Sequence, residues 1–189
     1  MIFLSASIPN QKDSKYFETA DLFAIRDAVR ALATVVIPYT NLVWGGHPAI
    51  TPLIRYVLTT MDINVHDRVT LYLSNFYQQE FIDDNSAFGN VILVDSAETQ
   101  EDSLKKLREQ MFTENKFSAG IFIGGMKGVE DEFELFKHYQ PHALLLPVGS
   151  TGGASRLIYD SQDSSDEKLL KDYAYMSVFK TLLKDHLNS

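Results

Sequence analysis

Three glycines and a lysine follow an apolar run in the segment AGIFIGGMKGVEDEFELF, residues 119–136. The pattern predicts a buried strand, a tight turn and an amphipathic helix. Gly124, Gly125 and Gly128 have no Cβ, so the backbone at this turn can approach a ligand closely. Lys127 adds a positive charge, and the helix start presents unpaired N–H groups. These residues predict a phosphate-binding turn, although taken alone they fit a simple tight connection equally well.

Four acidic residues crowd the first turns of the predicted helix, where they complement its dipole. We expect Glu132 to face the site, because Phe133 and Phe136 mark the buried side next to it. A carboxylate there could bind ribose hydroxyls or act as a general acid or base. Arg108, near the end of the preceding helix, could bring its forked donors to a phosphate. The sequence alone favours an exposed helix arginine at this position.

Three more turns of small or polar residues follow apolar runs: SAS at 5–7, GGH at 45–47 and GSTGGAS at 149–155. The histidine could donate to a phosphate or a base, or be an ordinary turn residue. The last turn suits a phosphate or a sugar, and it also fits a capped helix start. The candidate ligand-binding residues in and beside these turns are Ser5, Ser7, Gly45, Gly46, His47, Ser150, Thr151 and Arg156.

Apolar strands alternate with helical patterns along the chain, which predicts right-handed βαβ crossovers and a parallel sheet. The expected strands cover residues 2–7, 41–44, 69–73, 90–94, 119–123 and 143–148. Helices are expected over residues 19–35, from Pro48 to 61, over 98–112, from the glycine turn to Pro141, and over about 165–187. Polar loops are expected over residues 10–18 and 75–90.

This order of elements predicts a single α/β domain over residues 1–189, with a Rossmann-like parallel sheet and helices on both faces. In such a sheet, ligands bind outside the carboxyl ends of the strands. All four small-residue turns are expected at that edge. Their coincidence at one edge is a stronger signal than any single turn.

The composition excludes several classes of site. The chain has 189 residues, 45% of them hydrophobic, a net charge of -8 and no cysteine, so disulfides and thiolate ligands are absent. No histidine or carboxylate spacing indicates a metal, and we expect no cofactor. The charge does not favour nucleic acid. With no membrane span or signal peptide in the pattern, we expect a cytoplasmic protein.

Two segments rich in apolar residues have both a structural and a functional interpretation. Phe76, Tyr77 and Phe81 could stack on a ligand base, but such aromatics more often pack under a loop or at a subunit contact, and we prefer packing. The predicted C-terminal helix over about 165–187 carries a core-facing stripe that could extend into a dimer contact.

In their order along the chain, these segments resemble the SLOG superfamily. The SAS turn is similar to its first-strand Gly-Ser-Ser turn, and LVWGGHPAITPLI (42–54) to its second glycine turn. GGMKGVEDE (124–132) is similar to its P-G-G-x-G-T-x-x-E signature, with Ile123 and Val129 in place of proline and threonine and one added residue. The resemblance places Arg108 and Glu132 at the catalytic positions of LOG-type nucleoside-monophosphate phosphoribohydrolases.

The SASIP opening and GGHPAITPL more closely resemble SLOG sensor domains of bacterial conflict systems, such as the Thoeris defence effector. This implies a sensor for a phosphorylated ribosyl nucleotide, for example an NAD-derived cyclic signal. The alternative is hydrolysis of the N-glycosidic bond of a nucleoside 5′-monophosphate. Arg108 would then orient the phosphate, and Glu132 would handle the ribose or assist water. Whether the chain is an enzyme stays open, and the resemblance implies a homodimer or larger homo-oligomer.

Overall fold

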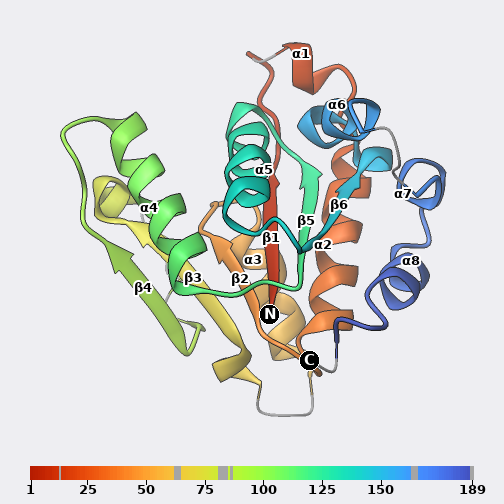
Figure 1. The fold of residues 1–189 in the computed structure, drawn as a ribbon, viewed down its shortest axis with the longest axis horizontal. Helices are drawn as coiled ribbons and strands as arrows, with labels where there is room; N and C mark the ends of the chain where they lie inside the picture. The colour runs from red at the N-terminus through yellow and green to blue at the C-terminus, as the bar shows by residue number, and fades with distance from the viewer. Residues whose placement is uncertain (13, 62–64, 81–84, 86, 163–165, 188–189) are drawn as a thin grey trace.

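One parallel sheet organises the chain. A computed structural model describes residues 1–12, 14–61, 65–80, 85, 87–162 and 166–187. Neighbouring strands are all parallel, in the order β4-β3-β2-β1-β5-β6 (Figure 1). The strands are β1 (Ile2–Ser7), β2 (Leu42–Gly45), β3 (Val69–Ser74), β4 (Asn90–Val94), β5 (Ala119–Gly124) and β6 (Leu144–Val148). The predicted α/β, Rossmann-like sheet is therefore confirmed.

Helices cover both faces of this sheet because strand side chains alternate between two apolar cores. In β1, Ile2 and Leu4 join one core and Phe3 joins the other. The first core lies against α2 (Leu22–Val36), α3 (Thr51–Thr59), α7 (Lys168–Lys171) and α8 (Tyr175–Leu182). The second lies against α1 (Ser14–Phe17), α4 (Gln100–Glu114), α5 (Lys127–Tyr139) and α6 (Gly153–Asp160), with α4 and α5 in front in Figure 1. Short 3₁₀ turns are η1 (His66–Arg68), η2 (Asn75–Glu80) and η4 (Gly149–Thr151).

Side-chain caps and prolines set the helix starts. The Asp21 carboxylate accepts the N–H groups of Phe23 and Ala24, so α2 begins at Leu22, later than predicted. The prediction that the third helix starts at Pro48 is wrong: α3 starts at Thr51, with proline in its first turn. The loop predicted over residues 10–18 contains α1, and the loop predicted over 75–90 contains η2.

The long C-terminal helix predicted over about 165–187 is also wrong. The structure has two short helices, α7 and α8, separated by residues 172–174, and residue 165 lies outside the described part. Asp172 takes an extended backbone (φ −99°, ψ 126°), and its Oδ1 accepts the N–H of Ala174 at 2.8 Å. Aspartate competes in this way with helical hydrogen bonds, so the apolar stripe continues across a break in the helix.

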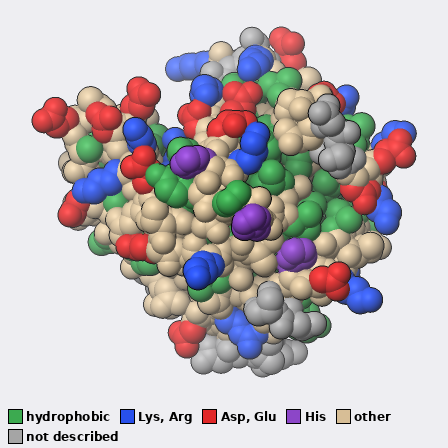
Figure 2. Space-filling model, viewed as in Figure 1, with side chains coloured by type: hydrophobic (Ala, Val, Ile, Leu, Met, Phe, Trp, Pro, Cys, Tyr) green, Lys and Arg blue, Asp and Glu red, His purple; other side chains and the backbone are tan. Residues whose placement is uncertain are grey.

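Charged side chains of both signs are interspersed over the face that carries α4 and α5 (Figure 2). No broad region of one sign dominates that view. A charged ligand must therefore be held by local groups rather than by the field of the whole face. Within the described ranges, no helix combines the length and apolar character needed to cross a membrane.

Candidate ligand-binding site at the carboxyl edge of the sheet

A cavity of about 520 Å³ lies at the carboxyl edge of the sheet. Its floor comes from the last residues of β1, β2 and β3, and its walls come from α4 and the first turns of α5. The chain order reverses at β1, which pairs with β2 on one side and β5 on the other. Ligands bind at this switch point in open parallel sheets, so the cavity is the candidate site.

The start of α5 forms one side of the cavity. Met126, Lys127, Gly128 and Val129 line it. Met126 occupies the position before the helix, and no described side chain caps this helix start. The first N–H groups of an α-helix have no partner within the helix and carry its positive dipole end. This side of the cavity therefore suits an anion such as a phosphate.

Arg108 and Glu132, both assigned to the site from the sequence, meet inside the cavity wall. Arg108 Nε donates to Glu132 Oε1 at 3.2 Å, and Ser5 Oγ donates to Glu132 Oε2 at 2.6 Å. Arg108 Nη2 also donates to the Gly128 carbonyl at 3.4 Å. The interpretation of Arg108 as an exposed arginine is wrong, because only 9% of it is exposed. Packing of α4 against α5 turns this residue inward.

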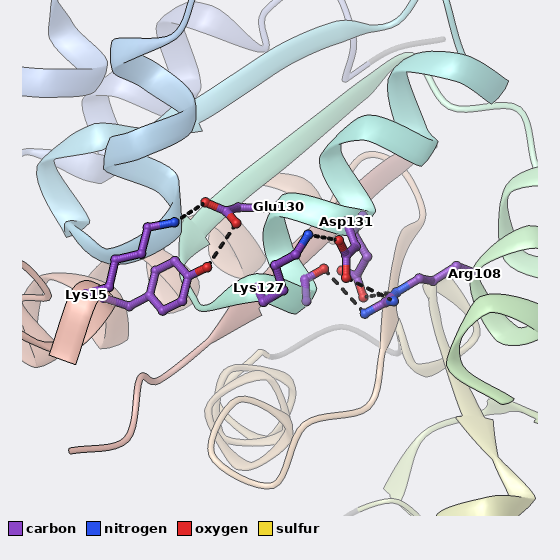
Figure 3. Close-up of polar contacts among 8 residues, drawn as sticks. Lys15, Arg108, Lys127, Glu130 and Asp131 are labelled. Carbon is purple, nitrogen blue, oxygen red and sulfur yellow. Dashed lines mark hydrogen bonds and ion pairs between the residues drawn. The ribbon is translucent and has the colours of Figure 1, made fainter. Parts of the chain in front are cut away.

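Asp131 lies between two cations beside the cavity (Figure 3). Its carboxylate contacts Lys127 Nζ in an ion pair and lies 3.9 Å from Arg108 Nη1. The Lys127 ammonium is largely exposed, whereas the Arg108 guanidinium is not. Both cations line the cavity, so each can reach a ligand there.

Tyr16, which the sequence did not single out, closes the cavity on the side of α1. It is 7% exposed, and its hydroxyl donates to Glu130 Oε2 at 2.9 Å. Lys15 Nζ lies 3.5 Å from the other oxygen of Glu130. Burial and the hydrogen bond to Glu130 raise the pKa of the Tyr16 hydroxyl. The residue lies in a segment that reads as a polar loop, so only the fold places it at the site.

His47 follows β2 and lines the cavity together with Gly45 and Gly46. Its Nδ1 accepts the N–H of Ala49 at 3.2 Å. Burial lowers the pKa of the imidazole, which favours the neutral form. With Nδ1 as acceptor, the proton of the neutral ring lies on Nε2. His47 is therefore a neutral hydrogen-bond donor at this edge.

The glycines at the end of β5 do not line this cavity. Gly124 and Gly125 have positive φ values of 58° and 86°, and their space is filled by the protein. A Cβ on Gly125 would lie 2.3 Å from Val129, and the Gly125 carbonyl accepts the N–H of Ala154 at 2.9 Å. Thr151 Oγ1 accepts the N–H of Gly124 at 2.8 Å. The close approach that these glycines allow is to Ile25 of α2 and to Val129 of α5 rather than to a ligand in the cavity.

The remaining residues of the last turn also have partners within the fold. Ser150 Oγ is 3.1 Å from the hydroxyl of Tyr175, which joins η4 to α8. Arg156 pairs with Asp160 on the surface of α6 at 2.8 Å. Neither residue lines the cavity, and Ser5 reaches it only through Glu132, whereas Ser7 lines it directly. A ligand-binding role for Ser150, Thr151 and Arg156 stays a prediction.

The cavity lining also includes apolar residues that the sequence did not assign to it. Leu104 and Leu107 of α4 belong to it, as do Leu73 and Tyr77. For Tyr77, packing was preferred over stacking on a ligand base. Its ring does contact Phe76 at 5.2 Å, but Tyr77 also faces the cavity. Phe81 lies outside the described residues. Among those residues, no group of histidines and carboxylates could hold a metal ion.

A parallel sheet with a cavity at its carboxyl edge and a helix start beside it defines a Rossmann-like protein with a candidate ligand-binding site. The model of the SLOG cluster3 family matches residues 15–183, so the chain belongs to the SLOG cluster3 family. The match confirms the resemblance to the SLOG superfamily, whereas the branch found in defence systems stays a prediction. No curated protein and no solved structure gives a significant match.

Proposed function

We propose that the chain is a sensor module that binds a phosphorylated ribosyl nucleotide in the cavity at the sheet edge. The observation that carries this proposal is the polarity of the cavity. The start of α5, Arg108 and Glu132 supply polar groups to its lining, and leucine side chains of α4 and β3 supply apolar surface. A nucleotide combines the same two kinds of surface, because its phosphate and ribose are polar and the faces of its base are apolar. An NAD-derived cyclic nucleotide is the ligand that the family resemblance favours.

Each polar group has a role in this proposal. The N–H groups at the start of α5 bind a phosphate, and Lys127 and the neutral His47 add a charge and a donor. Arg108 has five N–H donors, so it can hold Glu132 and still contact a phosphate. Glu132, fixed by Ser5 and Arg108, accepts from ribose hydroxyls. The protein groups that contact the ligand are then held mainly by hydrogen bonds that already exist without it.

A second candidate function is hydrolysis of a nucleoside 5′-monophosphate, and the Arg108–Glu132 pair supports it. Water would attack the ribose C1′ with assistance from Glu132, the bond from C1′ to the base nitrogen would break, and the base would leave with a proton. Arg108 would orient the phosphate. Against this, Val129 brings no hydroxyl to the wall of the cavity, where the family signature has a threonine. Binding without turnover is therefore our first proposal.

One experiment separates the two functions. The protein is incubated with nucleoside monophosphates, ADP-ribose and cyclic ADP-ribose, and both thermal shift and release of free base are followed. A ligand-specific rise in melting temperature without base release supports the sensor. Base release that is lost in Glu132→Gln supports the hydrolase. If no compound shifts melting or is turned over, both proposals fail.

A matched pair of variants locates the site. Lys127→Ala removes a cavity cation that pairs with Asp131, and Lys137→Ala removes a cation that pairs with Glu134 on the same helix but away from the cavity. The first variant should weaken nucleotide binding several-fold, because one phosphate contact is lost, and the second should not. Equal effects of the two variants would argue against phosphate at the start of α5.

A further inference from the structure

One face of α4 forms a continuous wall of the cavity. Gln100, Leu104, Leu107 and Arg108 all line it, and their spacing of four, three and one residues places them along one side of a helix. Gln100 and Arg108 lie about 12 Å apart along the helix axis, at about 1.5 Å of rise per residue. The wall is thus polar at both ends and apolar between them.

Gln100 is held at its end of the wall by Tyr77. The Gln100 Nε2 amide donates to the Tyr77 hydroxyl at 2.6 Å, and both side chains line the cavity. Tyr77 comes from η2, directly after β3, so the contact joins η2 to α4. A carboxamide has two N–H donors and one carbonyl acceptor. The bond to Tyr77 leaves the Oε1 acceptor and a second N–H next to each other.

We propose that the Gln100 end of the cavity binds the nucleobase, and that Gln100 selects adenine. Adenine presents its amino group beside a ring nitrogen, so a carboxamide can accept from one and donate to the other. Hypoxanthine and guanine present a carbonyl oxygen in place of that amino group, and this oxygen would face Gln100 Oε1 without a hydrogen bond. Tyr77 is a positioning residue that keeps the amide at this end of the cavity, and adenine is read in the orientation in which Gln100 Nε2 donates to the Tyr77 hydroxyl. Leu104 and Leu107 cover a face of the ring.

This inference rests on the proposed function, because it requires a phosphorylated ribose at the Arg108 end of the wall. The two can fail separately. The phosphate and ribose contacts come from α5, Arg108 and Glu132, and the base contacts come from Gln100 and Tyr77. Ribose 5-phosphate tests the first set of contacts without the second.

The experiment is isothermal titration calorimetry with adenosine 5′-monophosphate, inosine 5′-monophosphate and ribose 5-phosphate. The unchanged chain should bind the adenine nucleotide about tenfold more tightly than the hypoxanthine nucleotide, as is typical for a carboxamide read-out. In Gln100→Leu the two affinities should become nearly equal. In Tyr77→Phe the ratio should fall in the same direction while the melting temperature stays unchanged. Gln110→Leu is the control, since Gln110 is on the same helix, pairs with Glu114 and does not line the cavity.

Four results would overturn the inference. Equal affinities of the unchanged chain for the adenine and hypoxanthine nucleotides would do so, and so would a ratio that Gln100→Leu leaves unaltered. Ribose 5-phosphate that binds as tightly as the adenine nucleotide would overturn it while leaving the proposed function intact. Failure of all three compounds to bind would overturn the proposed function and this inference with it.

Discussion

At the residue scale, the two cations of the site differ in the free energy needed to break their ion pairs. Arg108 is 10% exposed in its side chain and contacts Glu132 at 3.2 Å. Removing one partner of a fully buried pair typically costs about 3–5 kcal/mol, and the cost for this part-buried pair is smaller. The exposed ion pair of Lys127 with Asp131 is worth about 0–1 kcal/mol. A hydrogen bond from Lys127 to a charged group of a ligand would contribute about 1.5–3 kcal/mol. We infer that Arg108 stays fixed when a ligand binds and that Lys127 can turn toward it.

His47 gives the pH dependence that belongs to this scale. Its pKa is lowered by burial in the folded chain, and in the unfolded chain it returns to about 6.5. Between the two values the unfolded chain binds more protons, so the free energy of unfolding falls as the pH drops through this window. Above about pH 6.5 the ring is neutral in both states, and the loss disappears. The loss is complete below the folded-state pKa.

The measurement compares urea unfolding of the unchanged chain and of His47→Gln from about pH 5 to about pH 8. The unchanged chain should lose stability relative to the variant as the pH falls, by at most about 1.4 kcal/mol per pH unit, the limit for one proton. Glutamine does not titrate, so the difference between the two curves isolates the imidazole. Stability curves that stay parallel over the whole range would contradict the prediction.

At the scale of elements, the turns after β5 and β6 pack against each other and against the segment before α2. Gly152 has a φ of 71°, and a Cβ there would lie 1.8 Å from the carbonyl oxygen of Thr19. The N–H of Gly153 donates to Thr19 Oγ1 at 3.1 Å. These contacts tie η4 and α6 to the chain that leads from α1 into α2. The glycine is required by internal packing as well as by its backbone angle.

Gly152→Ala should therefore destabilise the fold by about 2–5 kcal/mol, from a strained backbone and a clash with a backbone atom. Gly45→Ala is the control. It is a glycine of another turn at the same edge, where a Cβ would meet only Leu107 at an ordinary 3.6 Å. The measurement is urea unfolding of both variants. A loss in Gly152→Ala no larger than the loss in Gly45→Ala would refute this account of the turn.

At the scale of the whole molecule, two apolar cores share one sheet. Phe3 lies in the core beneath α4 and α5, where its ring contacts those of Phe112 at 4.9 Å and Phe136 at 5.1 Å. Trp44 lies in the core on the other face and is the only tryptophan of the sequence. Because β1 and β2 pair directly, we expect the two cores to unfold together as one domain.

Tryptophan fluorescence and far-UV circular dichroism should thus give the same urea midpoint. Phe3→Ala should lower both midpoints together, for a loss of about 3–5 kcal/mol, although the fluorescent residue is on the opposite face. Phe76→Ala, at a side chain that is 43% exposed, should change stability by about 0.5 kcal/mol or less. Separate midpoints for the two probes would show that the chain is not one cooperative domain. A homodimer or larger assembly also stays a prediction at this scale.

Local patterns in the sequence were sufficient for the strands and, apart from their ends, for α2, α3, α4 and α5. A strand or a helix can be predicted from about a dozen residues, by its apolar periodicity and its flanking turn residues. The prediction of one long C-terminal helix was wrong for a local reason: the hydrogen bond of Asp172 to the N–H of Ala174 interrupts the helix, although the apolar stripe continues across the break. The resemblance to the SLOG superfamily added the pairing of Arg108 with Glu132, which spacing alone did not favour.

By itself, the sequence determined an alternating α/β chain, a parallel sheet and four small-residue turns at one edge. Only the tertiary structure decided what each turn faces. The turn after β2 faces the cavity, whereas the glycines after β5 and β6 pack against each other. Ser5 and Glu132, 127 residues apart, meet because β1 pairs with β5 and α5 packs over both. Such meetings depend on strand order and packing, and no local pattern encodes them.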